Sequence, residues 1–177
     1  EPFDRVLLAT PPGASARLLE PLAKHLPAAA AWTAQAQALR FEAIATVYAL
    51  AQRPLPQGAA MLALRHGPSA PAQFVFDKAA LGGPKGLLAF VVSASGNDRE
   101  RLQADVLTQA QALGLGPLNV LQTVVEKRAT FACTPGLQRP VEAIAPGLWA
   151  AGDYVDGPYP ATLEGAVRSG LAAGRAV

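Results

Sequence analysis

Residues 148–170 of the 177-residue chain, LWAAGDYVDGPYPATLEGAVRSG, decide how the fold is interpreted. A short apolar run ends at Gly152-Asp153, and a helical pattern begins after Pro160. Gly152 lets a backbone come close to a ligand, and the Asp153 carboxylate can accept hydrogen bonds from hydroxyl groups. A helix that begins after Pro160 offers unpaired N–H groups and the positive end of its dipole to an electron-rich group. The stretch therefore predicts half of a site for a nucleotide cofactor.

The predicted final helix has two apolar faces when its residues are placed on a helical wheel. One face holds only small residues, namely Ala161, Gly165, Ser169, Ala172, Ala173 and Ala176. The other face holds Leu163, Val167 and Leu171. We expect both faces to be buried, and we expect Glu164 and Arg168 to form an i,i+4 ion pair. An ordinary buried C-terminal helix would show the same pattern, so the helix alone does not define a site.

Gly152-Asp153 and residues 161–170 (ATLEGAVRSG) resemble the C-terminal flavin-binding motif of the FAD-dependent amine oxidase and phytoene desaturase superfamily. Four further segments are similar to one branch, the squalene-associated FAD-dependent desaturases, which are understood as hydroxysqualene dehydroxylases. These segments are FEAIATVY (41–48), FVFDK (74–78), LLAFVVSASG (87–96) and EKRATFACTPG (126–136). The resemblance covers nearly the whole chain.

The resemblance implies that FAD is the cofactor and that one cluster of residues near the C-terminus contacts it. The implied contacts are Gly152, Asp153, Pro160, Ala161, Thr162, Leu163 and Gly165. Asp153 would meet the ribityl or phosphate-linked part of FAD, and the N–H of Leu163 would lie near the pyrimidine edge of the flavin ring. The implied activity is the reductive dehydroxylation of hydroxysqualene to squalene in hopanoid biosynthesis.

Three alternatives remain open at this point. A phytoene-type desaturase or an amine oxidase would use the same cofactor segment, although Thr162 occupies a position where an amine oxidase is expected to carry an aromatic residue. A flavin-free lipid-binding module could retain the motif as a relic.

One departure from the superfamily is that the chain contains no G-x-G-x-x-G unit between a strand and a helix. Gly114–Asn119 carries a proline in its turn and an asparagine in place of the third glycine, so it predicts a loop. Gly82–Gly86 predicts a tight turn between strands. We therefore expect the chain to be the C-terminal part of a longer flavoprotein whose N-terminal FAD domain is a missing partner. We expect this chain alone to lack FAD.

The periodicity along the chain predicts an α+β fold in which an antiparallel sheet with flanking helices forms the substrate domain and a C-terminal strand and helix belong to the FAD domain. The expected strands are 3–10, 41–50, 59–65, 73–78, 87–93 and 119–133, and the expected helices are 15–26, 28–39 and 97–113, the last capped by Asn97. We assign residues 1–10 to a strand returning from the FAD domain, 11–140 to the substrate domain and 141–177 to the FAD-contacting strand and helix.

The composition is that of a globular protein, because 51% of the residues are apolar and only 16% are charged. A net charge of +2 with scattered basic residues argues against a nucleic-acid partner. No apolar run is long enough to cross a membrane, and the single cysteine excludes an internal disulfide. We expect a cytoplasmic location, and peripheral contact with the inner face of the membrane stays open.

Asp77 is the candidate catalytic residue. It follows the apolar segment Phe74–Phe76, so its charge could face a substrate cavity and help an allylic hydroxyl to leave. A solvated aspartate in a turn would produce the same pattern.

Other polar residues give weaker signals. Arg128 and Thr130 share one face of a predicted strand and could orient a polar group, or they could lie in an ion pair or at an exposed edge. Cys133 lies in an apolar run and is expected to be a buried, inert thiol. His25 and His66 have no further ligands at metal-binding spacing, so no metal site is expected.

Overall fold

The computed structural model describes residues 3–96 and 98–176. The chain folds as two compact units. Unit 1 contains Glu1–Arg40 and Phe131–Val177, and unit 2 contains Phe41–Thr130. Unit 2 is thus shorter at both ends than the segment 11–140 that the sequence assigns to the substrate domain. The role of that segment stays a prediction.

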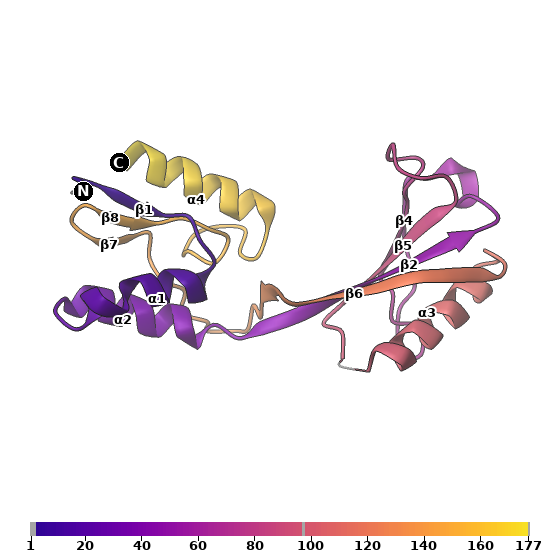
Figure 1. Cartoon of the computed structure of the whole chain (residues 1–177), viewed down its shortest axis with the longest axis horizontal. Helices are drawn as coiled ribbons and strands as arrows, with labels where there is room; N and C mark the ends of the chain where they lie inside the picture. The colour runs from indigo at the N-terminus through magenta and orange to yellow at the C-terminus, as the bar shows by residue number, and fades with distance from the viewer. Residues whose placement is uncertain (1–2, 97, 177) are drawn as a thin grey trace. The chain divides into compact units, whose positions relative to one another are not determined.

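Unit 1 contains a three-stranded sheet in the order β1 (Val6–Leu8), β8 (Leu148–Ala150), β7 (Ala143–Ala145) (Figure 1). β1 runs parallel to β8, with Leu7 opposite Trp149, and β7 runs antiparallel to β8. A strand from the start of the chain and two strands from its last third therefore form one sheet. The predicted strand 3–10 is confirmed in its central part only, because β8 offers just three residues for pairing.

Two helices, α1 (Pro12–Ala23) and α2 (Pro27–Ala38), form a hairpin in unit 1. Each begins with a proline in its first turn, where the missing N–H costs nothing and the fixed φ favours the helix. The Trp32 indole N–H donates to the Val141 carbonyl at 2.8 Å, which holds α2 against the segment that leads into β7. The last helix of unit 1, α4 (Leu163–Ala176), follows the loop after β8.

Unit 2 is built on a five-stranded sheet in the order β3-β4-β5-β2-β6. The bounds are β2 (Phe41–Ala51), β3 (Met61–Ala63), β4 (Phe74–Asp77), β5 (Leu87–Ser93) and β6 (Leu118–Phe131), with a short 3-10 helix η1 (Pro56–Gly58) after β2. The pairs β3–β4, β4–β5 and β5–β2 are antiparallel, as the sequence predicts.

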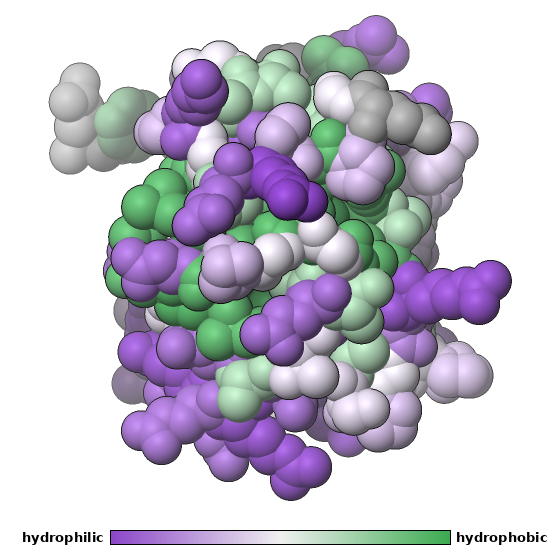
Figure 2. All heavy atoms as spheres, turned by 90° about the vertical axis from the view of Figure 1, so that its right-hand side faces the viewer, coloured by the Kyte–Doolittle hydropathy of each residue, from purple (hydrophilic) through white to green (hydrophobic). Residues whose placement is uncertain are grey.

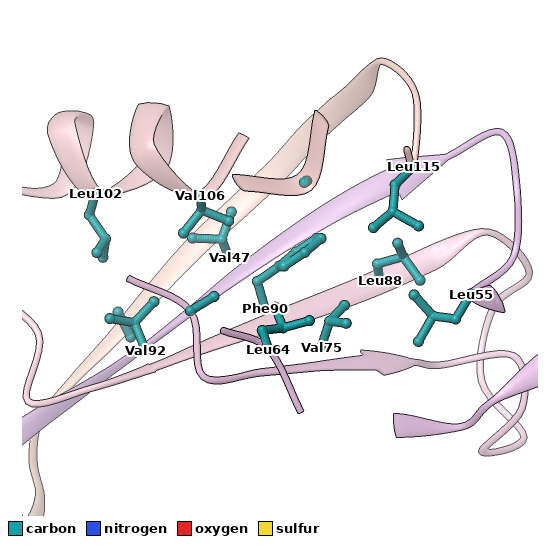
Figure 3. Packing of buried hydrophobic residues seen from close by; sticks show 13 residues of the cluster. Val47, Leu55, Leu64, Val75, Leu88, Phe90, Val92, Leu102, Val106 and Leu115 are labelled. Carbon is teal, nitrogen blue, oxygen red and sulfur yellow. The ribbon is translucent and has the colours of Figure 1, made fainter. Parts of the chain in front are cut away.

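The helix α3 (Arg99–Ala112) covers one face of this sheet and closes the core of unit 2 (Figure 3). Its side chains Leu102 and Val106 pack toward Val47 and Phe90 on the central strands. Asp98 is the N-cap, since its carboxylate accepts the N–H of Arg101 at 3.0 Å. The predicted cap, Asn97, lies outside the described residues.

The opposite face of the sheet is apolar but partly exposed. Side chains alternate between the two faces of a strand, so the register places Met61, Phe76, Ala89 and Tyr48 in one row across four strands on that face. Met61 is 50% exposed, and Phe74 in the neighbouring row is 39% exposed. Within the residues that the structure describes, no helix of unit 2 covers this face. An exposed apolar surface of this kind is typical of a site that binds a partner or a ligand.

The glycine-rich strings form turns, as predicted. Gly82 (φ 81°) and Gly86 (φ 75°) lie in the turn between β4 and β5, and Gly114 (φ 72°) and Gly116 (φ 75°) lie in the loop between α3 and β6. A left-handed φ favours glycine at such positions. Neither string combines a strand, a tight turn and a helix in the order that a dinucleotide fold requires.

Candidate cofactor site

The site predicted from the sequence lies in the loop between β8 and α4 of unit 1. Gly152 opens this loop, and its N–H donates to the Ser169 hydroxyl of α4 at 3.2 Å. A Cβ added at Gly152 would lie 2.5 Å from the ring of Tyr154, so only glycine fits. The close approach that Gly152 permits is therefore already used within the protein.

Tyr154 fixes the start of the loop. Its ring is buried and meets Trp32 edge to face, with centroids 6.2 Å apart. Its hydroxyl donates to the Thr10 carbonyl at 3.1 Å and lies 3.2 Å from the Ser15 hydroxyl. Burial raises the pKa of Tyr154 above its usual value, and the Ser15 hydrogen bond opposes that rise. The role of Tyr154 could not be predicted from the sequence, in which the only signal is an aromatic residue in a polar loop.

Asp153 lies between Gly152 and Tyr154 and is partly buried. Burial raises the pKa of its carboxyl group, whereas hydrogen bonds from the backbone N–H groups of Asp153 and Tyr154 and the charge of Arg139 lower it. Burial is the largest of these effects, so the hydrogen bonds and the charge within the protein do not fully offset the hydration that the Asp153 carboxylate loses. Such a group is suited to accept hydrogen bonds from the hydroxyl groups of a bound molecule.

Arg139 holds the middle of the loop. Its side chain, only 11% exposed, donates to the Val155 carbonyl at 2.9 Å and to the Gly157 carbonyl, and it forms an ion pair with Asp156 at 3.2 Å. One guanidinium group thus fixes three successive residues. The role of Arg139 could not be predicted from the sequence, because its partners lie 16 to 18 residues away and backbone carbonyls leave no trace in a residue pattern.

The end of the loop turns sharply into α4. Tyr159 (φ 59°) and Ala161 (φ 56°) have left-handed backbone conformations, on either side of Pro160. Thr162 is the N-cap, since its hydroxyl accepts the Gly165 N–H at 3.0 Å and donates to the Tyr159 carbonyl at 2.7 Å. A Cβ at Gly165 would collide with the Tyr159 carbonyl oxygen.

The first turn of α4 is open to a ligand. Leu163 is 88% exposed. The N–H groups of Leu163 and Glu164 have no acceptor within the helix, because an α-helix leaves its first N–H groups unpaired. The positive end of the helix dipole adds to their attraction for an electron-rich group. The N–H that the sequence assigns to the flavin ring is thus at an accessible helix terminus, and its contact with FAD stays a prediction.

The two faces of α4 differ in burial. On the small-residue face Gly165 and Ala173 are buried, so the expected burial is confirmed at these two positions, whereas Ala172 and Ala176 are exposed. The expectation that the second face is also buried is wrong for the described residues, because Val167 and Leu171 are 57% and 58% exposed. A helical wheel identifies faces but not the partner that covers them. These two side chains and residues 155–158 line a groove of about 520 Å³.

The charged residues of α4 behave as predicted. Arg168 pairs with Glu164 at 2.6 Å, and its guanidinium lies 4.9 Å from the centre of the Tyr159 ring. The pair therefore connects the helix to the turn that precedes it.

The remaining candidates lie elsewhere. Asp77 is in unit 2, only 6% exposed, on the side of β4 that faces α3, and its Oδ1 accepts the Ala79 N–H at 2.9 Å. Arg128 stacks on Phe41, with 4.0 Å from its guanidinium carbon to the ring centre, on the same unit. Cys133 is exposed, so the expectation of a buried thiol is wrong, because the apolar run ends where β6 ends at Phe131.

The described residues contain neither a metal-binding cluster nor a membrane-spanning helix. In residues 3–96 and 98–176, no group of three His, Cys, Asp or Glu side chains is placed to hold a metal ion. No helix in the same part of the chain is long and apolar enough to cross a membrane.

The local chemistry fits one end of FAD. The loop presents a partly buried acceptor, Asp153, beside the free N–H groups of a helix terminus, and both are held in place by Arg139 and Thr162. A flavin and its ribityl chain carry hydroxyl donors and carbonyl acceptors of the matching kinds.

Comparisons with known proteins agree with this chemistry. Over 94 residues the chain is 42% identical to a hydroxysqualene dehydroxylase from Rhodopseudomonas palustris (strain ATCC BAA-98 / CGA009), covering 44% of this chain and 22% of that protein. A putative protoporphyrinogen oxidase from Exiguobacterium sp. 255-15 has a TM-score of 0.61 at 24% identity, covering 98% of this chain and 41% of that one. An oxidoreductase from Methanosarcina mazei has a TM-score of 0.68 at 18% identity, covering 99% and 43%.

The two solved structures share the fold, and the chain spans less than half of their length. The family described as flavin containing amine oxidoreductase matches residues 1–177. Together with the loop and helix described above, this match places the chain in a family by its whole length, and the chain belongs to the flavin-containing amine oxidoreductases.

Proposed function

We propose that this chain is the C-terminal part of an FAD-dependent oxidoreductase that reductively dehydroxylates hydroxysqualene to squalene for hopanoid synthesis. The observation that carries the choice of substrate is the 42% identity to a protein named hydroxysqualene dehydroxylase. The apolar face of the unit 2 sheet supports a lipid substrate, because a hydrocarbon chain gains free energy when it leaves water to cover such a surface.

In this proposal the residues of unit 1 hold the cofactor, which when bound would supply the hydride. Asp153 accepts hydrogen bonds from its hydroxyl groups, and the first-turn N–H groups of α4 bind an electron-rich edge. Gly152, Pro160, Ala161 and Gly165 shape the backbone around it, and Thr162 caps the helix so that Leu163 is correctly placed.

The residues of unit 2 shape the substrate site. Met61, Phe74 and Phe76 would contact the hydrocarbon and exclude water from it. Because the hydrocarbon dissolves in membranes, the enzyme would work as a peripheral membrane protein. We place it on the cytoplasmic side.

The catalytic role of Asp77 remains a proposal, and two observations compete with it. Asp77 lies on the side of β4 that faces α3, opposite to Phe74 and Phe76, which would contact the hydrocarbon. Its carboxylate ties the turn after β4 through Ala79. Asp77→Asn in a protein with a complete FAD domain keeps the Oδ1 acceptor and removes the charge. A catalytic Asp77 requires a loss of turnover well above threefold, about 0.7 kcal/mol, at unchanged flavin content. A smaller loss would leave Asp77 as a turn residue only.

The decisive experiment is a substrate screen with the complete protein. We expect reduced flavin and hydroxysqualene to give squalene. Desaturation of phytoene by oxidised flavin, or oxidation of an amine, would replace the proposed activity with one of its relatives. A colourless complete protein that still binds isoprenoids would identify a lipid-binding module.

A further inference from the structure

One end of unit 2, called here the tip, is formed by three loops. They are residues 50–56, which run from the end of β2 to the start of η1, residues 78–86 between β4 and β5, and residues 113–118, which run from the end of α3 to the start of β6. Ala51 donates to the Gly86 carbonyl at 2.8 Å, which joins the first loop to the second. Leu50 and Pro117 line one shallow groove, which joins the first loop to the third.

The tip combines exposed leucines with basic residues. Leu50, Leu81 and Leu113 are 39%, 54% and 42% exposed. Arg53 and Lys85 are exposed and Lys78 is partly buried. The three loops contain no Asp, Glu, Phe, Tyr or Trp. Figure 2, which views the molecule from the side of unit 2, shows hydrophobic surface beside hydrophilic side chains.

The loop that carries Leu81 is ordered by its own hydrogen bonds. The N–H groups of Leu81 and Gly83 both donate to the Lys78 carbonyl, at 3.2 and 2.6 Å, and Gly82 donates to Ala79 at 3.1 Å. The Asp77 carboxylate holds the Ala79 N–H from below. The loop therefore holds the Leu81 side chain in an exposed position. A partner that contacts Leu81 would have to order little more of this loop, so the loss of conformational entropy on binding would be small.

The chemistry of this surface favours a bilayer over a protein. Leucines can enter the boundary between headgroups and acyl chains while lysines and arginines attract anionic phosphates. Protein interfaces are instead enriched in aromatic residues and depleted in lysine. The absence of acidic residues from the three loops removes the repulsion that an anionic membrane would otherwise meet.

We propose that the tip docks unit 2 onto a bilayer that contains anionic lipids. The proposal rests on the proposed function only in that a hydrocarbon substrate gives the protein a reason to meet a membrane. Its test contains neither flavin nor isoprenoid, so its failure and the failure of the proposed activity are distinguishable.

The test is co-sedimentation of the 177-residue chain with phosphatidylcholine vesicles, with and without phosphatidylglycerol. We expect binding that requires the anionic lipid and weakens with salt. The variant Arg53→Glu/Lys85→Glu should lose roughly tenfold or more in partitioning, and Leu81→Asp a comparable factor. The matched control is Arg99→Glu/Lys127→Glu, which makes the same change in charge at exposed residues of unit 2 outside the tip and should lose clearly less.

All of these residues are exposed, so circular dichroism and thermal unfolding should match the parent chain. Equal losses in the tip and control variants would show that only total charge matters and would overturn the proposal. Loss of binding in Val167→Asp/Leu171→Asp, with the tip variants unaffected, would move the contact to α4. Self-association without vesicles that Leu81→Asp abolishes would make the tip an interface between copies.

Discussion

At the scale of single residues, the loop between β8 and α4 contains side chains that stabilise the fold beside one that does not. Tyr154 and Arg139 each satisfy several partners. Asp153, by contrast, has a pKa raised mainly by burial, so its ionised form is held at a cost in the protein alone. Functional sites often keep such groups, because a ligand supplies the missing hydrogen bonds.

We therefore expect Asp153→Asn to stabilise this chain and to weaken flavin binding in the complete protein. The folded pKa lies above the unfolded value near 3.9, so the parent loses stability as the pH rises from about 4 through the folded pKa. Asparagine does not titrate, so its advantage in melting temperature should appear at neutral pH and fade toward about pH 3. Flavin affinity should fall about tenfold, since one charge-assisted hydrogen bond is lost. A variant less stable than the parent at pH 7 would mean that Arg139 and the backbone N–H groups outweigh burial.

At the scale of elements, α4 shows how a helix is fixed by one glycine. Gly165 lies against the Tyr159 carbonyl, and Thr162 caps the same turn. Gly170 and Gly174, in the same helix, would have nothing within 4 Å of an added Cβ. The three glycines are alike in sequence and different in packing.

Gly165→Ala and Gly170→Ala should consequently have opposite effects on the free energy of unfolding. The added methyl group at position 165 must displace Tyr159 or the helix, at a cost of about 1–3 kcal/mol. At position 170 alanine has free space and a higher helix propensity, so it should stabilise by roughly 0.5–1 kcal/mol. Urea unfolding of both variants measures the difference. Equal, small effects would show that α4 is not held against the turn.

Element types could be predicted from the sequence wherever a pattern is long or its ends are marked. β5 has the predicted bounds, because glycine precedes its apolar run and polar residues follow. β1 and β3 are shorter than predicted, since their ends depend on the partner strand that pairs with them. The exposure of Cys133 and of the α4 face formed by Leu163, Val167 and Leu171 likewise depends on which segments pack against them. The periodicity of a sequence contains no information on those segments.

The candidate site was predictable in its glycines and its helix start, which leave marks in the residue order. Arg139 and Tyr154 were not, because their contacts join segments far apart in the chain. The assignment of FAD contacts to Asp153 and Leu163 stays a prediction from resemblance. Its physical basis is the accessible first turn of α4 and the partly buried carboxylate beside it.

At the scale of the whole molecule, the chain belongs to a flavin-containing family, and we propose that the loop after β8 and the start of α4 form one part of a flavin site. It contains no G-x-G-x-x-G unit, and it spans 41–43% of two solved structures that share its fold. The exposed side chains of Val167 and Leu171 beside the groove on α4 form an apolar surface that a further domain could cover.

Hence we expect the purified 177-residue chain to contain no tightly bound FAD. Phosphate anchoring at a glycine-rich turn supplies a large part of the affinity for a dinucleotide, and no segment here can form that turn. Absorbance of the purified chain in the flavin region, with FAD titration followed by fluorescence, measures this directly. An N-terminal FAD domain supplied in trans should restore binding, and Val167→Asp/Leu171→Asp should abolish that restoration. Stoichiometric flavin in the chain alone would show that loop 152–162 and α4 are sufficient to hold the cofactor.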